Sequence, residues 1–394
     1  MAAIRRKRIL IVDDSAVMRS LLRSVVCADA ELEVAGTAAD GRSALSTIAT
    51  VRPDLILLDV EMPVMDGLVT LKQLRARGNK MPVIMCSSLT QRGARVTIEA
   101  LAGGASDYVT KPAGQSGREA ATRALSQDLI PKIHALTSHL QGQLQQPVFP
   151  GLPGAGVPAP GFPGSTRTPL MLPAAPAFKP QPVTSVPQVL VIGVSTGGPA
   201  ALDILMPAFP ASFPLPIAIV QHMPELFTKL FAERLDGRCG LKVCEAAEGD
   251  PMRAGTAYIA RGNWHLEVLA ASRAGQPATL RLNQGPLENH CRPAVDVLFR
   301  TAASVYGSGV LGLVLTGMGS DGLAGCRLIR EQGGTVVAQD QATSTVWGMP
   351  GAVTNAGLAH SVLPLSAIAP EILRIVSRTN SESYELRRRV VQSW

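Results

Sequence analysis

The segment Val189–Leu205 reads VLVIGVSTGGPAALDIL, and the order of its residue types decides the fold of the C-terminal half of the chain. Its first six residues are apolar or Gly, which is typical of a parallel strand covered on both faces. The polar turn Ser195–Gly198 follows, and Pro199 suits the first turn of a helix that continues through Leu205. A strand, a sharp turn and a helix in this order predict an α/β fold with a parallel sheet.

The same pattern recurs on both sides of this segment. Further buried parallel strands are expected at PIAIVQH (216–222), GVLGLVLTG (309–317) and GTVVAQD (334–340), and shorter, possibly antiparallel ones at TAYIARG (256–262), HLEVLAA (265–271) and ATLRLNQ (278–284). Toward the N-terminus, strands alternate with helical segments at RILIVDD (8–14), ELEVAGT (31–37), PDLILLD (53–59), MPVIMCSS (81–88) and DYVT (107–110). The chain is therefore expected to be α/β, with two doubly wound parallel-sheet domains.

A change of composition separates the two halves. No Asp or Glu occurs between Asp128 and Asp203, and 12 of the 30 prolines fall between Pro147 and Pro187. Such a stretch cannot bury enough apolar surface to offset its ordering entropy. We therefore expect a domain over residues 1–140, a Pro/Gly/Ala-rich linker over 141–187, a second domain over 188–378 and a C-terminal tail over 379–394.

Composition also excludes several classes of function. The 394 residues are 46% hydrophobic, yet no window approaches the roughly 20 apolar residues of a membrane span, and the N-terminus does not resemble a secretory signal. The six cysteines show no metal-binding spacing, which favours reduced thiols and a cytoplasmic protein without membrane insertion. Although the net charge is +7, Lys and Arg are scattered and no DNA-binding motif is present, so nucleic acid is not an expected partner.

Acidic residues follow two strands of the N-terminal half. Asp13 and Asp14 end the first strand and Asp59 ends the third, so all three should meet at the carboxyl edge of the sheet. Three carboxylates at one point need a cation, and Mg²⁺ prefers such oxygen ligands. Ser87 and Lys111 follow two further strands. A metal, a hydroxyl and a lysine around Asp59 predict a site in which this carboxylate accepts a phosphoryl group.

The C-terminal half places a serine, a histidine and an aspartate beyond three expected strands. Ser195 lies at the strand-to-helix turn, His222 ends the next strand, and Asp321 follows GVLGLVLTG. Parallel strands would bring the three to one edge, where His222 could take the proton of Ser195 and Asp321 could orient the imidazole. Backbone N–H groups at the start of the helix could stabilise an oxyanion.

Two other interpretations of these motifs stay open at the level of pattern. The glycines around Ser195 could cradle a phosphate. The segment Gly317–Gly322 also matches G-x-G-x-x-G after a strand, with Asp340 near the position of a ribose-binding acid, as in dinucleotide-binding folds. The dinucleotide interpretation leaves Ser195 and His222 without a role.

The stretches ILIVDDS, LILLDVEMPVMDG, PVIMCSS and DYVTKP resemble the receiver domain of response regulators, over residues 8–130. The resemblance implies a flavodoxin-like fold and phosphorylation of Asp59 by a histidine kinase. It implies a Mg²⁺ site made by Asp13, Asp14, Asp59 and the backbone carbonyl of Glu61. Ser87 and Tyr108 would be switch residues beside Lys111, and the Lys111–Pro112 peptide bond would be cis.

Residues 188–375 resemble the catalytic domain of the chemotaxis protein-glutamate methylesterase family, with a Rossmann-like fold. The matching stretches are VIGVSTGGPAAL, QHMPELFTKLFAERLD, HCRPAVDVLFRTAA, VLGLVLTGMGSDGLAG and VWGMPGAV. The resemblance implies a serine nucleophile (Ser195), a base (His222) and an orienting acid (Asp321), with Thr196 and Met318 at the oxyanion site and no cofactor for the esterase.

Together the two resemblances imply a phosphorylation-activated serine hydrolase in sensory adaptation. It would demethylate glutamyl γ-methyl esters of methyl-accepting chemoreceptors, release methanol and deamidate certain glutamines, with a chemotaxis histidine kinase as phosphodonor. The alternative is a receiver-controlled regulator that binds proteins of a non-chemotaxis receptor array.

Overall fold

The computed structural model describes residues 5–112, 117–138 and 186–377. We call residues 5–138 the N-terminal domain and residues 186–377 the C-terminal domain. The expected linker over 141–187 lies outside the described residues except for its last two positions, and the expected tail over 379–394 lies wholly outside them.

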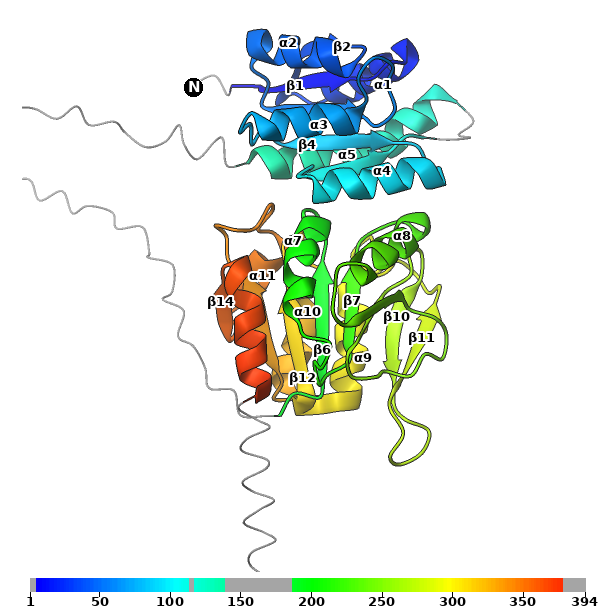
Figure 1. The fold of residues 1–394 in the computed structure, drawn as a ribbon, viewed down its shortest axis with the longest axis vertical. Helices are drawn as coiled ribbons and strands as arrows, with labels where there is room; N and C mark the ends of the chain where they lie inside the picture. Colours follow the sequence, from blue (N-terminus) through cyan, green and yellow to red (C-terminus); the bar gives the residue numbers. More distant parts are fainter. Residues whose placement is uncertain (1–4, 113–116, 139–185, 378–394) are drawn as a thin grey trace, which may run out of the picture.

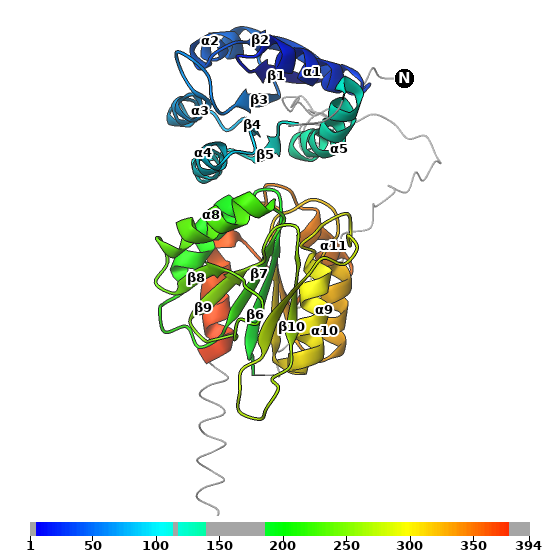
Figure 2. The same cartoon turned by 90° about the vertical axis from the view of Figure 1, so that its right-hand side faces the viewer.

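The N-terminal domain is a five-stranded parallel sheet with the strand order β2-β1-β3-β4-β5. Its strands are β1 (Lys7–Val12), β2 (Leu32–Ala38), β3 (Leu55–Asp59), β4 (Val83–Ser87) and β5 (Asp107–Thr110). Its helices are α1 (Ala16–Cys27), α2 (Gly41–Val51), α3 (Gly67–Ala76), α4 (Gln91–Ala102) and α5 (Arg118–Thr137). Helices α1 and α5 pack on one face of the sheet, and α2, α3 and α4 cover the other (Figure 2).

Local sequence sets the start of these helices. Ser15, Asp40, Asp66 and Thr90 each accept a hydrogen bond from a backbone N–H of the first turn, which satisfies a donor that the helix cannot. Strands β3 and β4 are buried along their whole length, as expected for strands covered on both faces. Each strand therefore ends where a polar loop begins, at the carboxyl edge of the sheet.

The C-terminal domain contains a seven-stranded parallel sheet with the order β14-β13-β12-β6-β7-β9-β8, and a separate antiparallel pair, β10 and β11. The strands are β6 (Val189–Val194), β7 (Ile217–Gln221), β8 (Lys242–Glu245), β9 (Thr256–Ile259), β10 (His265–Leu269), β11 (Thr279–Asn283), β12 (Val310–Val314), β13 (Thr335–Gln339) and β14 (Ser361–Leu363). The helical segments are α7 (Gly198–Leu205), η2 (Met206–Ala208), α8 (Glu225–Asp236), α9 (Val295–Tyr306), η3 (Gly307–Gly309), α10 (Leu323–Glu331), α11 (Met349–Asn355) and residues 365–377.

The expected α/β class with two doubly wound parallel sheets is confirmed. Of the three shorter strands, β10 and β11 pair in antiparallel fashion, whereas β9 is parallel to β7 and β8. The expectation of a cis Lys111–Pro112 peptide is wrong, because Arg292–Pro293 is the cis bond that the described residues contain. No helix in the described ranges is both long and apolar enough to cross a membrane.

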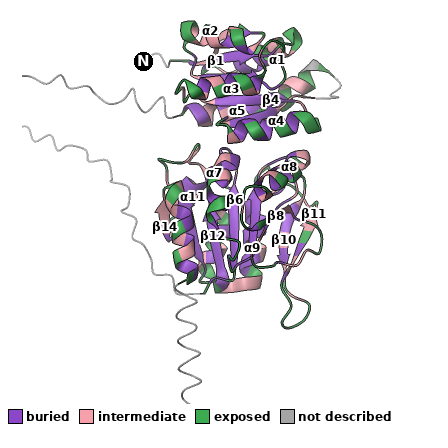
Figure 3. Cartoon of the chain, viewed as in Figure 1, coloured by how far each residue is buried: buried purple, intermediate pink, exposed green. Residues whose placement is uncertain are grey.

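The two domains pack against each other along the α4 side of the N-terminal domain. Helix α4 lies against α7 and α8 (Figure 1), and Figure 2 also shows α4 beside α8. The Tyr108 ring stacks on Phe227, with centroids 4.7 Å apart, and one buried apolar cluster continues from the first sheet into the second. Figure 3 shows buried residues along both sheets. The N-terminal domain thus lies over the end of the second sheet where β6 meets α7.

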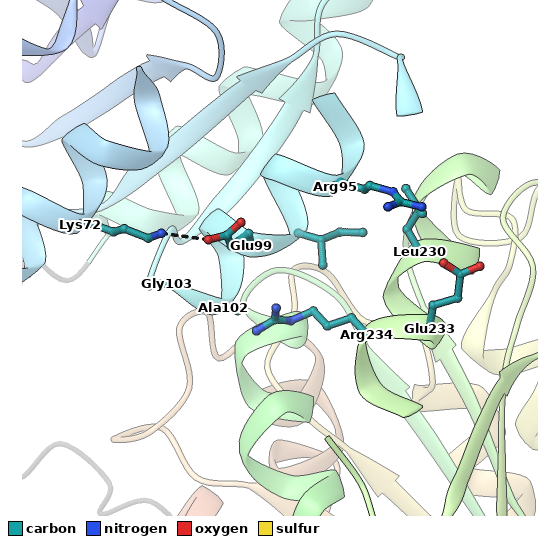
Figure 4. A pocket seen from close by; sticks show the side chains of 9 residues that line it. Lys72, Arg95, Glu99, Ala102, Gly103, Leu230, Glu233 and Arg234 are labelled. Atoms are coloured by element: carbon teal, nitrogen blue, oxygen red, sulfur yellow. Dashed lines mark hydrogen bonds and ion pairs between the residues drawn. The ribbon is translucent and has the colours of Figure 1, made fainter. Parts of the chain in front are cut away.

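A cavity of about 570 Å³ flanks this contact between α4 and α8. Figure 4 shows basic and acidic side chains around it, among them Arg95 and Glu99 from α4 and Glu233 and Arg234 from α8. Glu99 pairs with Lys72 within the N-terminal domain at 2.9 Å. Charged groups therefore surround this part of the contact, while its apolar part lies around Tyr108 and Phe227.

Candidate active site

Ser195 lies at a sharp turn between β6 and α7. Gly197 takes a φ of +79°, which side chains rarely adopt, and a Cβ there would lie 2.4 Å from Oγ1 of Thr345. The N–H of Ser195 donates to the carbonyl of Thr316 at 3.0 Å, and its own carbonyl accepts from Gly198 at 2.8 Å. The turn is therefore fixed from both sides, and Ser195 sits at the carboxyl end of a central strand.

His222 follows the neighbouring strand at the same level. Strands β6 and β7 are paired with Val194 opposite Gln221, and the N–H of His222 donates to the carbonyl of Val194 at 3.2 Å. Ser195 and His222 directly follow the paired residues Val194 and Gln221, and neighbouring strands of a sheet lie roughly 5 Å apart. The expected juxtaposition of these two residues at one sheet edge is present in the backbone.

Asp321 lies against the imidazole from the loop after β12. Its Oδ2 is 2.9 Å from Nε2 of His222, and the carboxylate is buried. It also accepts hydrogen bonds from the backbone N–H groups of Val295 (2.7 Å), Asp296 (3.0 Å) and Gly322 (2.9 Å). Burial opposes the charged form, but the hydrogen bond from His222 and these amides lower the pKa of Asp321. Asp321 is therefore a fixed anion that orients the ring.

The other ring nitrogen of His222 has a partner that sequence reasoning did not identify. Sγ of Cys291 lies 3.7 Å from Nδ1, and no hydrogen bond joins Ser195 Oγ to His222 among the residues described. Burial disfavours the imidazolium, but the hydrogen bonds with Asp321 and Cys291 raise the pKa of His222 to about 9. The structure therefore forms the His222–Asp321 pair, while Nδ1, the nitrogen left for Ser195, faces a thiol.

Asn289 is a second residue that the sequence analysis missed. Its Nδ2 donates to Oδ1 of Asp321 at 2.9 Å and to Oδ2 of Asp296 at 2.8 Å, so it bridges two buried carboxylates. Asn289 and His290 have φ values of +52° and +62°. The signal in the sequence is Asn at a position that needs the left-handed region, but spacing alone does not reveal it.

The loops after β6 and β12 also present backbone donors. Within the described part of the chain, the N–H groups of Thr196 and Met318 have no hydrogen-bond acceptor. Thr316 fixes both loops, because its Oγ1 donates to the carbonyl of Thr196 at 2.9 Å and accepts from the N–H of Val346 at 3.0 Å. These two N–H groups could therefore bind an anionic oxygen near Ser195.

The hydrogen bonds around the loop 317–322 argue against the dinucleotide interpretation. Asp321 is committed to His222 and three backbone amides. Asp340, the expected ribose ligand in that interpretation, accepts hydrogen bonds from the N–H and Oγ1 of Thr343 at 3.0 and 2.6 Å. Both acids thus stabilise the local structure of their own loops.

The N-terminal domain brings its predicted acids together. Ligand oxygens of Asp13, Asp14 and Asp59 lie within 4.8 Å of one another. Nζ of Lys111 is 2.8 Å from Asp13 and 2.7 Å from Asp59. Burial raises the pKa of Asp59 to about 6 despite the nearby lysine, and the pKa of Lys111 is raised by the two carboxylates although burial opposes it. Three carboxylates, two of them buried, share a single lysine, so this oxygen donor set fits a hard divalent cation.

The remaining predicted residues of this domain differ in where their side chains point. Ser87 is buried at the end of β4, and its hydroxyl donates to the carbonyl of Ser88 at 3.2 Å. Glu61 is in the loop after β3, with its side chain 3.2 Å from Arg92. Tyr108 points to the domain contact rather than to Asp59. Beside it, Oδ2 of Asp107 accepts a 2.6 Å hydrogen bond from Oγ1 of Thr196, which connects the two sites.

Comparisons with known proteins agree with this two-part arrangement. Two family models match the chain, CheB methylesterase over residues 190–372 and response regulator receiver domain over residues 9–122. A protein-glutamate methylesterase/protein-glutamine glutaminase of Nocardioides sp. is 49% identical over 371 residues, which are 94% of this chain and 96% of the relative. One of Trichodesmium erythraeum is 47% identical over 93% of this chain and 98% of its own length. The solved catalytic domain of Thermotoga maritima CheB methylesterase is 41% identical, with a TM-score of 0.47, and the match covers 49% of this chain and 100% of that domain.

Proposed function

Because the chain belongs to the protein-glutamate methylesterase/protein-glutamine glutaminase family, we propose that Ser195, His222 and Asp321 carry its hydrolytic chemistry. The enzyme is a receiver-regulated methylesterase and glutaminase. The observation that supports the residue assignment is the hydrogen bond between His222 and the buried Asp321, formed beside the strand that ends at Ser195.

The reaction follows from this geometry. Oγ of Ser195 attacks the carbonyl carbon of a glutamyl γ-methyl ester while Nδ1 of His222 takes its proton, because Nε2 is bound to Asp321. The N–H groups of Thr196 and Met318 stabilise the oxyanion. The ester bond breaks, the proton passes to the leaving oxygen and methanol departs. Water then attacks the acyl-enzyme in the same way and releases the glutamate; with a glutamine substrate the leaving group is ammonia.

Ser195 must displace Cys291 from Nδ1 before it can react. The two strand ends are already adjacent, so we infer that rotation of the side chains brings the hydroxyl to the ring. A hydrogen bond that is loose or misaligned without substrate is common in hydrolases, and tightens when substrate binds.

The N-terminal domain controls this reaction through phosphorylation of Asp59. Asp13, Asp14, Asp59 and the backbone carbonyl of Glu61 would hold Mg²⁺, which when bound neutralises charge on the phosphoryl group. Lys111 contributes a second positive charge at the carboxylate.

We propose a chemotaxis histidine kinase as the phosphodonor and methyl-accepting chemoreceptors as substrates, with the enzyme in the cytoplasm. The division into residues 1–140, 141–187, 188–378 and 379–394 is part of the same proposal.

The domain contact supports a steric form of control. Thr196, the residue after Ser195, is bonded to Asp107, and α7 begins beneath α4. A receptor segment could not reach Ser195 while this contact persists. Phosphorylation of Asp59 would shift the population toward a separated form. The alternative, a regulator that only binds proteins, is not favoured by the family assignment.

The test is substitution of the nucleophile. Methanol release from methyl-labelled receptor membranes should fall by at least about a thousandfold in Ser195→Ala. Ser212→Ala, an exposed serine of the same domain, is the matched control and should retain the wild-type rate. Release by Ser195→Ala at the rate of the control would exclude Ser195 as the nucleophile.

A further inference from the structure

Cys291 is a thiol beside the base that the proposed reaction does not use. Its Sγ lies 3.7 Å from Nδ1 of His222, and one donor atom each of Cys291, His222 and Asp321 lie within 4.8 Å of one another. Cys291 is half-buried, and 14% of the His222 side-chain surface is exposed to solvent. Small solutes therefore have access to the pair. From this cluster we propose that His222 and Cys291 bind a thiophilic divalent metal ion, such as Zn²⁺, which inhibits the esterase.

The distance between the two donors suits such an ion. Zn²⁺ binds sulfur at about 2.3 Å and imidazole nitrogen at about 2.0–2.1 Å, so the edge between these ligands in a tetrahedral site is about 3.5 Å. The observed 3.7 Å between Sγ and Nδ1 is within a few tenths of this value. A metal can therefore enter between the two atoms without moving the backbone, and water can fill its remaining positions.

The thiol is held in place by a tight turn. Glu288 and Cys291 exchange two backbone hydrogen bonds, of 3.1 and 2.9 Å, across Asn289 and His290, both of which have positive φ. Asn289 anchors this turn to Asp321 and Asp296. The carboxylate of Glu288 pairs with Arg300 at 2.9 Å. Five contacts therefore fix the turn that carries Cys291, unlike the backbone of a mobile surface cysteine.

Asp321 completes the arrangement from the other side of the ring. A metal-bound histidine usually donates its second N–H to a carboxylate, which fixes the tautomer and strengthens the metal bond. Nε2 of His222 has this partner at 2.9 Å. Because both oxygens of Asp321 already accept several hydrogen bonds, we assign it the orienting role and leave the ligand positions to His222 and Cys291.

The metal would inhibit hydrolysis because it binds Nδ1 of His222. Nδ1 is the nitrogen that must receive the proton of Ser195, and a metal bound there removes the base. Substrate and metal would therefore compete for the same ring. The inhibition part of this inference rests on the proposed function, whereas the binding part does not.

The experiment uses the full-length protein with a thiol-free reductant. Zn²⁺ is titrated against hydrolysis of a small ester, and each rate is compared with the metal-free rate of the same variant. Co²⁺ binding is followed separately by the thiolate-to-cobalt charge-transfer absorption, which the carboxylates of the N-terminal domain cannot produce. EDTA should restore the full rate, which separates metal binding from oxidation of the thiol.

Cys291→Ser should raise the Zn²⁺ concentration for half-inhibition at least about tenfold and abolish the charge-transfer absorption. Cys239→Ser, another half-buried thiol of this domain, should behave as the wild type in both measurements. Equal inhibition of the Cys291→Ser and wild-type proteins, or absorption that survives in Cys291→Ser, would overturn the inference.

Ser195→Ala separates this inference from the proposed function. The variant should keep the cobalt absorption while losing hydrolysis. Hydrolysis that persists in Ser195→Ala would refute the assigned nucleophile but leave the metal site standing. Loss of the absorption in Cys291→Ser together with undiminished Zn²⁺ inhibition would refute inhibition through this site.

Discussion

Oγ1 of Thr196 donates a 2.6 Å hydrogen bond to Oδ2 of Asp107, and this bond ties the residue after the candidate nucleophile to the last strand of the receiver. Both groups are buried. A buried hydrogen bond to a carboxylate contributes about 1.5–3 kcal/mol. It is therefore a measurable part of the free energy that keeps the two domains together.

Asp107→Ala should raise the rate of the unphosphorylated enzyme, because the closed form loses this bond. The expected increase is roughly tenfold to a hundredfold, the factor that about 1.5–3 kcal/mol represents. Initial rates of methanol release without a phosphodonor measure it. Asp128→Ala is the control. Lys132 pairs with both acids, at 3.7 Å from Asp107 and 2.9 Å from Asp128, but Asp128 is exposed and makes no hydrogen bond or ion pair with the described part of the second domain. An unchanged rate in Asp107→Ala would contradict steric control through this contact.

The stacked rings of Tyr108 and Phe227 should couple across the same contact. Aromatic pairs contribute about 0.5–1.5 kcal/mol beyond their buried area. In a double-mutant cycle of Tyr108→Leu and Phe227→Leu, each single variant should raise the basal rate and the second substitution should add little. Phe213→Leu, which removes a ring from a pair within the C-terminal domain, should lower stability without freeing the active site. Additive effects of Tyr108→Leu and Phe227→Leu would show that the stack does not hold the domains.

The raised pKa of His222 predicts the pH dependence of hydrolysis. Only the neutral imidazole can accept the proton of Ser195, and with a pKa of about 9 the ring is mostly protonated at pH 7. In the presence of EDTA, kcat/KM should therefore rise about tenfold per pH unit and level off near pH 9. Asp321→Asn should move the inflection to lower pH as well as reduce the rate. A profile that is flat above pH 7 would be inconsistent with this protonation state.

Gly317→Ala should reduce activity by displacing the nucleophile. A Cβ at this position would lie 2.4 Å from Sδ of Met349 and 2.9 Å from Cβ of Ser195, so a neighbour must move. Overpacking of this kind typically costs about 1–3 kcal/mol, which thermal unfolding can measure. Gly237→Ala, where the nearest atom is 3.7 Å away, is the control for activity and stability. Wild-type kcat in Gly317→Ala would mean that Ser195 tolerates the shift.

Asp59→Asn should abolish stimulation by a small phosphodonor, because the variant lacks the carboxylate proposed to accept the phosphoryl group. Removal of Mg²⁺ from the wild-type enzyme should have the same effect. The ratio of rates with and without acetyl phosphate is the measurement, and Glu33→Gln, on β2 away from the acids, is the control. Stimulation that survives in Asp59→Asn would assign the phosphoacceptor to another residue.

The strand ends were predictable from sequence, and most of the side-chain contacts were not. Asp13, Asp59, Ser195, His222 and Asp321 each follow a buried apolar run, and the parallel sheet then places them at its edge. The contact of Cys291 with His222 depends instead on a turn with two residues of positive φ, which has no periodic signal. The direction of β9 was equally hidden, because a four-residue strand has the same composition in either orientation.

The bond from Thr196 to Asp107 escaped prediction for a different reason. It joins two domains whose relative placement is set by surface complementarity between α4, α7 and α8 rather than by any motif. Sequence patterns describe each sheet by its own hydrophobic periods, and they carry no information on which outer faces meet.

Strand β5 is only four residues long, with Asp107 and Tyr108 at one end and Lys111 directly after the other. At about 3.3 Å per residue, the four steps from Asp107 to Lys111 span roughly 13 Å of extended backbone, which joins the candidate phosphate-accepting centre to the candidate hydrolase site. A tilt of this one strand would therefore move both ends together, without a relay of side chains. Substitutions that change the stiffness of β5 could therefore alter how strongly phosphorylation activates the enzyme, while the residues of both reaction centres stay unchanged.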